Sequence, residues 1–386
     1  MTRKFSKRFF TALSFLLILS IALAPALTPV SVYASTAFSE YDASFDYAAV
    51  SLEPETANEV GAPARALSQA ELKSLRLYAG GIPFGVKFMT EGILIVGFCD
   101  IDGKKANPSG EAGLRMGDRI ISVNGKEISS ASELTDAVEK SGGRTLSIEY
   151  LREGTKYTAK LTPAYSQNEK CYKTGLYVKD NGAGIGTVTY IDPSSLSFGG
   201  LGHGICEGES GSLVPIQRGS VVDVCINGVI KGQRGTPGEV KGYFKAGKLG
   251  SLLKNSDCGV FGVYASLPKG LPSEPLPLGL RNEVKEGKAY IWCTLNEGLP
   301  QKYEIEISNI DRSASAGKCF TVTVTDPALL AKTGGIVQGM SGSPIIQNGK
   351  LVGAVTHVLI NDPTTGYGIF IENMLSAAQM PQQRAA

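Results

Sequence analysis

The run GMSGSP at residues 339–344 encloses Ser341 between glycines and is followed by an alternating stretch typical of a strand. Such a turn could expose a hydroxyl for acyl transfer, or it could be only a tight turn. A free serine hydroxyl is a poor nucleophile near neutral pH, so catalysis would require a general base. The backbone amides of Gly339 and Ser341 could converge on one point, as an oxyanion hole requires.

Two histidines are available as the base, His203 and His357. His203 lies in the glycine-rich run FGGLGHGICEG after a predicted strand, a position from which a side chain can face a cleft; the alternative is an exposed loop histidine. His357 lies in the predicted strand LVGAVTHVLI and is typical of a half-buried strand histidine. The search for a base therefore reduces to these two residues.

A second glycine-flanked serine, Ser210 in GESGSL at 208–213, lies only seven residues after His203. We interpret it as part of a β-turn. Neither serine matches the Gly-x-Ser-x-Gly nucleophile elbow, because Ser212 and Ser343 occupy the last position. This mismatch, together with the scarcity of helical patterns, argues against an α/β-hydrolase.

The composition indicates a globular chain rich in turns. Its 386 residues suffice for two or three domains, with 42% hydrophobic and 19% charged residues, and 47 glycines favour an all-β or loop-rich fold. A net charge of +2 offers no basic field for nucleic acid, and the seven scattered cysteines lack zinc-ligand spacing. We expect no nucleic-acid partner, metal or cofactor. The cysteines are interpreted as buried small hydrophobic residues, with a Cys206–Cys225 bridge left open.

The N-terminal segment begins with four basic residues and continues with the uncharged run 9–24. That run is shorter than the ~20 residues of a spanning helix. Residues 1–34 are therefore predicted to be a signal peptide with a cleavage site at Val32-Tyr33-Ala34, or an uncleaved membrane anchor. Residues 35–74 are predicted to be an acidic linker, because acidic residues dominate up to Ala64 without any Lys or Arg.

Residues 75–163 contain a glycine-rich turn, an apolar strand, a short helix, a strand with an Asn124-Gly125 turn, a helix with a Ser130–Glu133 capping box, and a final hairpin. This order resembles a PDZ domain, most specifically in AGLRMGDRIISVNG at residues 112–125.

A PDZ domain binds the end of a peptide or protein as an added strand and holds its terminal carboxylate with backbone amides. The resemblance places this carboxylate loop at Phe84, Gly85 and Val86, beside the strand 86–88. The alternatives are that the glycines only permit a turn, and that the domain is a scaffold without a ligand.

Residues 164–386 alternate short strands with glycine turns, a pattern that indicates a β-sandwich or barrel. GMSGSP with its following strand resembles the nucleophile loop of trypsin-like serine peptidases. The wider run 325–375, together with GLGHGI at 200–205, resembles the stage IV sporulation protein B (SpoIVB) serine peptidase family of endospore-forming bacteria.

The resemblance implies a mainly-β chain in which a PDZ domain is followed by a trypsin-like double β-barrel peptidase domain. It implies His203 as general base, Ser341 as nucleophile and Asp326 as the acid that orients the imidazole. The amides of Gly339 and Ser341 would form the oxyanion hole, and no metal or cofactor is needed. The expected enzyme is a serine endopeptidase.

The acid has competing assignments. Asp326 precedes Ser341 by only fifteen residues, whereas an aspartate at a barrel junction is expected earlier, where Asp257 lies. Asp326 also matches a helix N-cap, because Pro327 follows it and Gly334 ends the predicted helix. One carboxylate could serve both purposes, with one oxygen on the helix and the other on the imidazole.

Met340 stands where trypsin-like zymogens carry an aspartate that pairs with a newly cut N-terminus. A methionine cannot form this ion pair, so activation is predicted not to use it. Regulation through the PDZ domain or through self-cleavage in the linker is expected instead.

The resemblance also implies export into the space between the inner and outer forespore membranes, with possible membrane association through the N-terminal segment. The expected substrate there is a membrane-bound regulator, whose cleavage frees an intramembrane metalloprotease to process a late sigma-factor precursor. Two alternatives remain: a non-catalytic PDZ signalling or binding protein, and a periplasmic-type quality-control protease. The latter is less favoured because such proteases usually place the PDZ domain after the peptidase.

Overall fold

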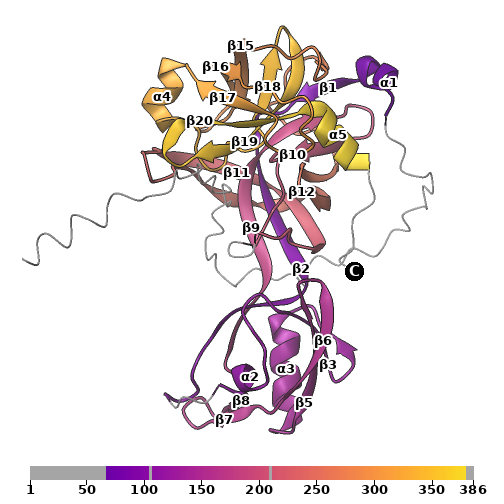
Figure 1. The fold of residues 1–386 in the computed structure, drawn as a ribbon, viewed down its shortest axis with the longest axis vertical. Coiled ribbons are helices and arrows are strands. Elements are labelled where there is room, and N and C mark those ends of the chain that lie inside the picture. The colour runs from indigo at the N-terminus through magenta and orange to yellow at the C-terminus, as the bar shows by residue number, and fades with distance from the viewer. Residues whose placement is uncertain (1–66, 104–106, 208–210, 380–386) are drawn as a thin grey trace, which may run out of the picture. The chain divides into compact units, whose positions relative to one another are not determined.

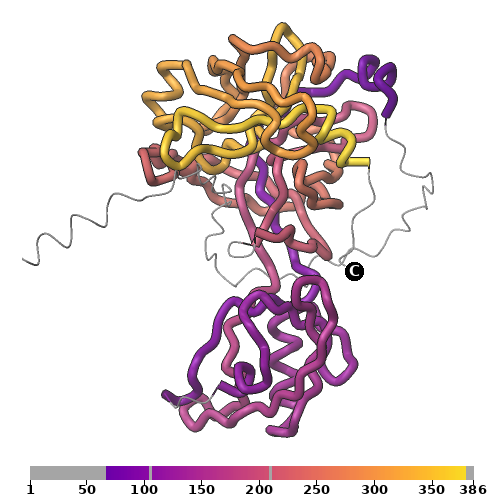
Figure 2. The backbone as a smooth tube through the Cα atoms, viewed as in Figure 1, coloured from indigo at the N-terminus to yellow at the C-terminus, as the bar shows by residue number. Residues whose placement is uncertain are grey.

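The computed structural model describes residues 67–103, 107–207 and 211–379 (Figure 1). The expectations for residues 1–34 and for most of the linker fall outside these residues. Within them, no helix combines the length and apolar character needed to cross a lipid bilayer. Strands predominate among the elements, and the mainly-β fold class is confirmed (Figure 1). Figure 2 traces the same backbone as a tube coloured from the N-terminus to the C-terminus.

Six strands close into a first ring through antiparallel pairs in the order β2–β9–β10–β13–β12–β11, with β11 returning to β2. The interior of this ring is apolar and buries Phe84, Phe198, Val221 and Val260. The strands are β2 (Pro83–Phe98), β9 (Leu176–Ile191), β10 (Ser197–Gly200), β11 (Ile216–Ile230), β12 (Glu239–Ser256) and β13 (Gly259–Tyr264).

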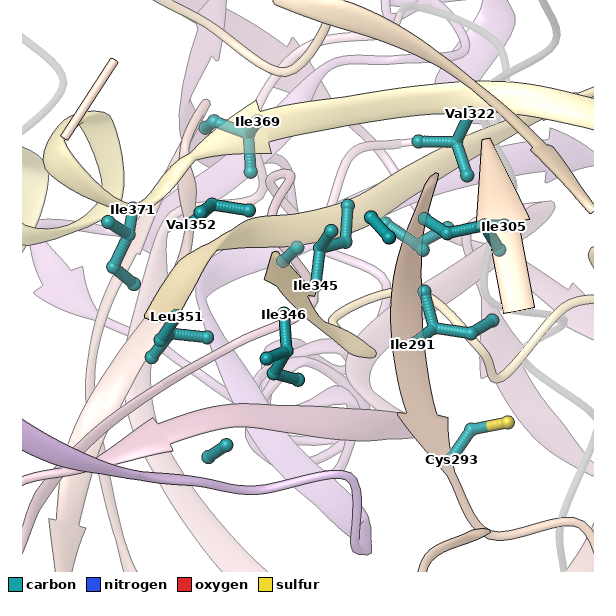
Figure 3. Close-up of a cluster of buried hydrophobic side chains, with 14 of the residues drawn as sticks. Ile291, Cys293, Ile305, Val322, Ile345, Ile346, Leu351, Val352, Ile369 and Ile371 are labelled. Carbon is teal, nitrogen blue, oxygen red and sulfur yellow. The ribbon is translucent and has the colours of Figure 1, made fainter. Parts of the chain in front are cut away.

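A second closed barrel follows in the order β15–β16–β17–β20–β19–β18. In β16, the sequence QKYEIEIS buries every second residue from Tyr303 to Ile307, as expected for a strand with one face on a core. Ile291, Ile305 and Ile345 meet in that core (Figure 3). The strands are β15 (Gly287–Cys293), β16 (Gln301–Ser308), β17 (Phe320–Val324), β18 (Pro344–Gln347), β19 (Lys350–Leu359) and β20 (Asp362–Phe370).

The helices are short and lie at the edges of these sheets. Helix α1 (Gln69–Ser74) begins at a Ser68–Glu71 capping box and precedes β1 (Arg76–Ala79), which pairs with β9 and with β14 (Leu276–Pro277). Helix α4 (Pro327–Thr333) leads into the Ser341 turn, and α5 (Ile371–Gln379) follows β20.

Two six-stranded closed sheets are the architecture of a trypsin-like double barrel.

The PDZ-like segment has its own core, which includes Ile93, Ile120, Leu134 and Ile148. Its main helix, α3, begins at the predicted Ser130–Glu133 capping box and ends at Gly142 in the left-handed conformation. The segment contains α2 (Pro108–Glu111), β3 (Arg119–Val123), β4 (Lys126–Glu127), α3 (Ala131–Ser141), β5 (Leu146–Arg152), β6 (Thr155–Leu161), β7 (Ala164–Ser166) and β8 (Cys171–Lys173).

Strands β2 and β9 belong to both the first ring and the PDZ-like segment. The first half of β2 pairs with the second half of β9, and Leu94–Phe98 of β2 pairs with Leu176–Lys179 of β9 inside the segment. The chain therefore enters the peptidase ring through β2 before it forms the PDZ-like segment, and it returns to the ring through β9.

The assignment of Phe84, Gly85 and Val86 as the PDZ carboxylate loop is wrong. These residues lie near the start of β2, where all three pair with β9 and where Gly85 and Val86 also pair with β11 on the other side. The stretch is therefore part of a continuous sheet of the peptidase ring and not a loop that could hold a carboxylate. The glycine permits close packing instead, since a Cβ on Gly85 would lie 2.6 Å from side-chain atoms of Phe244 and Val222.

The seven cysteines are all free thiols, so the bridge between Cys206 and Cys225 is not formed. Cys225 is buried and its Sγ donates to Glu297 Oε1 at 3.2 Å. Burial raises the pKa of Cys293 to about 12, so this thiol is protonated at neutral pH. The prediction of buried cysteines is therefore confirmed for Cys225, Cys293 and Cys319 and wrong for the other four, which are only partly buried.

Candidate active site

The turn that carries Ser341 packs directly against the loop that carries His203. The link is Thr187 of β9, whose amide donates to the Ser341 carbonyl at 3.0 Å and whose carbonyl accepts from the Leu201 amide at 3.2 Å. Gly342 makes this approach possible, because a Cβ there would lie 2.0 Å from the Thr187 carbonyl oxygen. The structure thus brings together the predicted nucleophile and the loop of the predicted base.

Ser341 is buried, and its Oγ donates to the carbonyl of Thr356 at 2.8 Å. The acceptor belongs to β19, one residue before His357. The hydroxyl is therefore held against the backbone of the neighbouring strand.

The backbone amides of the Ser341 turn are not equivalent. The amides of Met340, Gly342 and Ser343 donate to the carbonyls of Val337, Val355 and Met340, respectively. In the part of the chain that the structure describes, the amides of Gly339 and Ser341 donate to no protein acceptor.

The directions of these two amides are nevertheless fixed. The carbonyl of Gln338 accepts from Val240, and the carbonyl of Met340 accepts from Ser343. In a planar trans peptide the N–H points opposite to the carbonyl, so each bond orients the following amide, that of Gly339 or Ser341. Two oriented donors without an acceptor among the described residues, on either side of Met340, are therefore available to an oxyanion.

His203 is buried, and its Nδ1 lies 2.9 Å from the carbonyl oxygen of Gly204. Because a carbonyl can only accept, Nδ1 carries the proton and Nε2 holds the lone pair of the neutral ring. Nε2 is buried and makes no hydrogen bond to the described residues. Burial lowers the pKa of His203 below its usual value, so the ring is neutral and can accept a proton at neutral pH.

Backbone strain lies immediately before this histidine. Leu201 has φ +64° and Gly202 has φ +69°, two consecutive residues in the left-handed region that bulky side chains rarely occupy. The side chain of Asn255 then holds the next part of the loop through the backbone of Ile205. The conformation that presents His203 is thus held from both sides.

His357 lies next to His203, with ring centroids 5.0 Å apart, although sequence reasoning favoured an ordinary strand histidine. Burial, reinforced by His203 and Lys318, lowers the pKa of His357 to about 3. The second ring is therefore neutral at physiological pH and adds no positive charge beside the base.

Asp326 occupies the helix-cap position. Its Oδ1 accepts from the amides of Ala328 and Leu329, at 2.9 and 3.1 Å, and its Oδ2 accepts from the amide of Glu304 at 3.1 Å. The cap of α4 is thus present as the sequence predicts. Among the described residues, no hydrogen bond joins Asp326 to His203, and its role as triad acid stays a prediction.

The other candidate acid, Asp257, lies exposed in the turn between β12 and β13. It is near Cys206, whose thiol pKa is raised by burial and by the charge of Asp257. In the described structure it also makes no hydrogen bond to His203. Among the described residues, the Gly204 carbonyl is therefore the group that orients the His203 ring.

Replacing Asp326 with alanine is expected to lower the free energy of unfolding by about 1–2 kcal/mol, because the first-turn amides of α4 lose their acceptor. Asp326→Asn keeps a cap acceptor and should recover most of this stability. Urea denaturation and peptide turnover of both variants check this. Turnover reduced about 10⁴-fold in Asp326→Asn at wild-type stability would instead assign the carboxylate to the triad.

Met340, beside Ser341, is buried in the apolar core. Activation without a zymogen-type salt bridge stays a prediction. The residues that the structure describes contain no cluster of His, Cys, Asp or Glu that could hold a metal ion.

The structure presents a strand edge in the PDZ-like segment that sequence reasoning missed. Residues 176–181 of β9 pair with β2 on one side, and no described strand pairs with their other side. Helix α3 adjoins this edge, since the Ala131 amide donates to Asp180 Oδ2 at 2.7 Å and the Tyr172 amide donates to Glu139 Oε1 at 2.8 Å. The signal was the run TGLYV at 174–178, a glycine followed by three consecutive apolar residues.

The family comparisons agree with both parts of the chain. The family model described as SpoIVB peptidase S55 matches residues 170–375, and the model described as PDZ domain matches residues 89–162. The order of the two matches is the one expected from the sequence.

A curated relative is NMA0084 of Neisseria meningitidis serogroup A, which is provisionally named a zinc metalloprotease. It is 30% identical to this chain over 86 residues, which are 22% of this chain and 17% of that protein. The chain therefore spans less than a fifth of that relative.

Two solved structures are also similar. One is the PDZ domain of the SdrC-like protein Lmo2051 from Listeria monocytogenes, which is 19% identical to this chain. The match covers 23% of this chain and 87% of that structure, with a TM-score of 0.20. An HtrA-type protease, an AlgW variant with a decapeptide, shares 12% identity over 54% of each chain, with a TM-score of 0.31. Both scores lie below 0.5, and the double barrel rests instead on strand pairing.

Proposed function

Because the chain belongs to the SpoIVB peptidase S55 family and is a serine endopeptidase, we propose that Ser341 is its nucleophile and His203 its general base. The observation that carries this proposal is the pair of oriented amides, those of Gly339 and Ser341, which have no acceptor among the described residues and belong to the turn that carries the buried Ser341 hydroxyl. Ser341 is buried, and the backbone amide of a buried residue normally has a hydrogen-bond partner.

In the proposed mechanism, His203 Nε2 takes the proton of Ser341 Oγ while Oγ attacks the substrate carbonyl carbon. The carbonyl oxygen becomes an oxyanion that accepts from the amides of Gly339 and Ser341. The imidazolium keeps its Nδ1 proton on the Gly204 carbonyl and gives its Nε2 proton to the leaving amine. Water then attacks the acyl-enzyme while His203 Nε2 takes a proton from it. The imidazolium returns this proton to Ser341 Oγ as the acid product leaves.

A fluorophosphonate probe tests the nucleophile. Peptide mass spectrometry of the labelled, folded protein is expected to find the phosphonyl group on Ser341 and none on Ser210. A folded protein that takes up no label would favour the alternative of a non-catalytic PDZ binding protein. Labelling at another serine would move the active site away from the 339–344 turn.

The proposed setting is the space between the two forespore membranes, with a membrane-bound regulator of an intramembrane metalloprotease as substrate. The family name supports sporulation, and the basic, then uncharged, N-terminus supports export or anchoring. Cleavage of that regulator by the purified chain, without broad digestion of unfolded casein, tests this proposal. Broad casein digestion would favour a quality-control protease.

The PDZ-like segment is proposed to bind the C-terminus of a peptide or protein as a strand added to residues 176–181 of β9. The edge beside α3 supports this location. A peptide with a free carboxyl terminus should bind more tightly than its C-terminal amide in a fluorescence titration; equal affinities would argue against carboxylate capture.

Regulation through the PDZ-like segment, and self-cleavage in the linker, remain proposals. Two contacts support the former. Strand β9 carries both the edge at 176–181 and Thr187, which touches the Ser341 turn. Arg119 of β3 also forms an ion pair, at 2.6 Å, with Glu207, four residues after His203.

A further inference from the structure

Two threonines of β9, Thr187 and Thr189, lie beneath the nucleophile turn. They are two residues apart, so their side chains leave the strand on the same face, and both are buried. Thr187 Oγ1 donates to the Gly339 carbonyl at 2.8 Å, and Thr189 Oγ1 donates to the Gly342 carbonyl at 2.8 Å. The two hydroxyls therefore hold the two glycines on either side of Ser341.

These glycines are the points at which the turn could change shape. Gly339 has φ +94° and Gly342 has φ +93°, in a region of backbone space that glycine occupies freely. A peptide unit next to a glycine can rotate at small cost unless its carbonyl or amide is bound. A hydrogen-bond donor on each glycine carbonyl therefore restricts backbone rotation at the two residues that have no side chain to restrict it.

The consequence for the oxyanion hole follows through the peptide planes. Thr189 fixes the Gly342 carbonyl, and with it the Ser343 amide in the same plane. The Ser343 amide donates to the Met340 carbonyl at 2.9 Å, which in turn fixes the Ser341 amide. Thr187 fixes the Gly339 carbonyl and, in the same plane, the Met340 amide. This plane joins the planes that contain the Gly339 and Ser341 amides, so Thr187 restricts rotation of the backbone between the two oxyanion donors.

We propose that Thr187 and Thr189 are positioning residues that hold the oxyanion amides of Gly339 and Ser341 in their catalytic directions. This inference rests on the proposed function, since it assigns a role to residues around the same site. Neither threonine touches the reacting atoms. Each acts through one hydrogen bond from its hydroxyl to one carbonyl. An isosteric substitution can therefore remove this bond and keep the packing of the side chain.

Thr187→Val and Thr189→Val remove the hydroxyls and keep the shape of the side chains. Each variant is expected to lower kcat about 10–100-fold with little change in KM, a fraction of the 10²–10³-fold cost of losing an oxyanion donor outright. Affinity for a peptide boronate, which mimics the tetrahedral intermediate, should fall in parallel. Thr187→Ser restores the hydroxyl and should recover most of the turnover.

The matched control is Thr90→Val. Thr90 is buried and its Oγ1 donates to a glycine carbonyl, that of Gly92, at 2.7 Å, within the β2 strand. This substitution should reduce thermal stability by an amount similar to that of Thr187→Val and leave kcat unchanged. An equal kcat loss in Thr90→Val would show a general effect of destabilisation and overturn the inference.

The two levels of proposal give different results. Suppose that the wild-type protein cleaves peptide. If kcat and boronate affinity are then unchanged in both valine variants, the positioning role alone is overturned. A wild-type protein that neither turns over peptide nor reacts with fluorophosphonate would overturn the proposed function, and the positioning role with it.

Discussion

Replacing Ser341 with alanine is expected to lower kcat about 10⁶-fold, to the residual rate that binding and the oxyanion hole supply without a nucleophile. Turnover of a fluorogenic peptide substrate, compared with wild type at equal protein concentration, measures the loss.

The loss is not expected to come from unfolding. Ser341 Oγ makes one hydrogen bond, to the Thr356 carbonyl, and such a bond contributes about 1 kcal/mol. Thermal unfolding of Ser341→Ala should therefore stay within a few degrees of wild type. Ser210→Ala serves as the control and should keep wild-type turnover; this second glycine-flanked serine, predicted to lie in a β-turn, falls outside the described residues. More than 1% of wild-type turnover in Ser341→Ala would exclude Ser341 as the nucleophile.

Local patterns were the part of the fold that the sequence predicted well. The capping box of Ser130 and Glu133 and the caps of α4 at Asp326 and Gly334 are all present. Each of these features depends on contacts between residues at most eight positions apart. Their geometry is therefore set by propensity and hydrogen bonding along one short stretch.

Long-range pairing was harder to predict, and Phe84 to Val86 show why. A glycine-rich stretch can be a loop or a strand, and only its partners decide. Here the partners are residues 184–186 of β9 and 221–222 of β11, far along the chain. The PDZ resemblance placed a ligand loop there because it assumed one continuous domain, whereas β2 passes through the peptidase ring first.

The candidate site shows the same division. Ser341 and His203 stand in glycine-rich turns whose local pattern suggests exposure of a side chain, and the structure brings their loops together. Thr187 and Thr189 were missed, because alternating threonines in a strand usually indicate its solvent face. Their burial depends on the Ser341 turn, which arrives about 150 residues later in the chain.

Replacing His203 with alanine is expected to lower kcat about 10⁴–10⁶-fold, because Ser341 then has no base. The residual activity should lose the acid limb of the pH profile that belongs to the imidazole. His203→Ala removes one hydrogen bond, from Nδ1 to the Gly204 carbonyl, so circular dichroism should show an unchanged fold. Residual turnover above 10% of wild type would exclude His203 as the base.

The wild-type pH profile tests how His203 is oriented. Only the neutral ring accepts a proton, and burial holds the pKa of His203 below the usual 6.5. Activity should therefore be constant from neutral pH down to that lowered pKa and fall only as the pH drops through it. A carboxylate facing Nδ1 would favour the imidazolium and move the acid limb of kcat/KM upwards. An acid limb below pH 6.5 supports orientation by the Gly204 carbonyl; one at pH 7 or above would place an aspartate against the ring during catalysis.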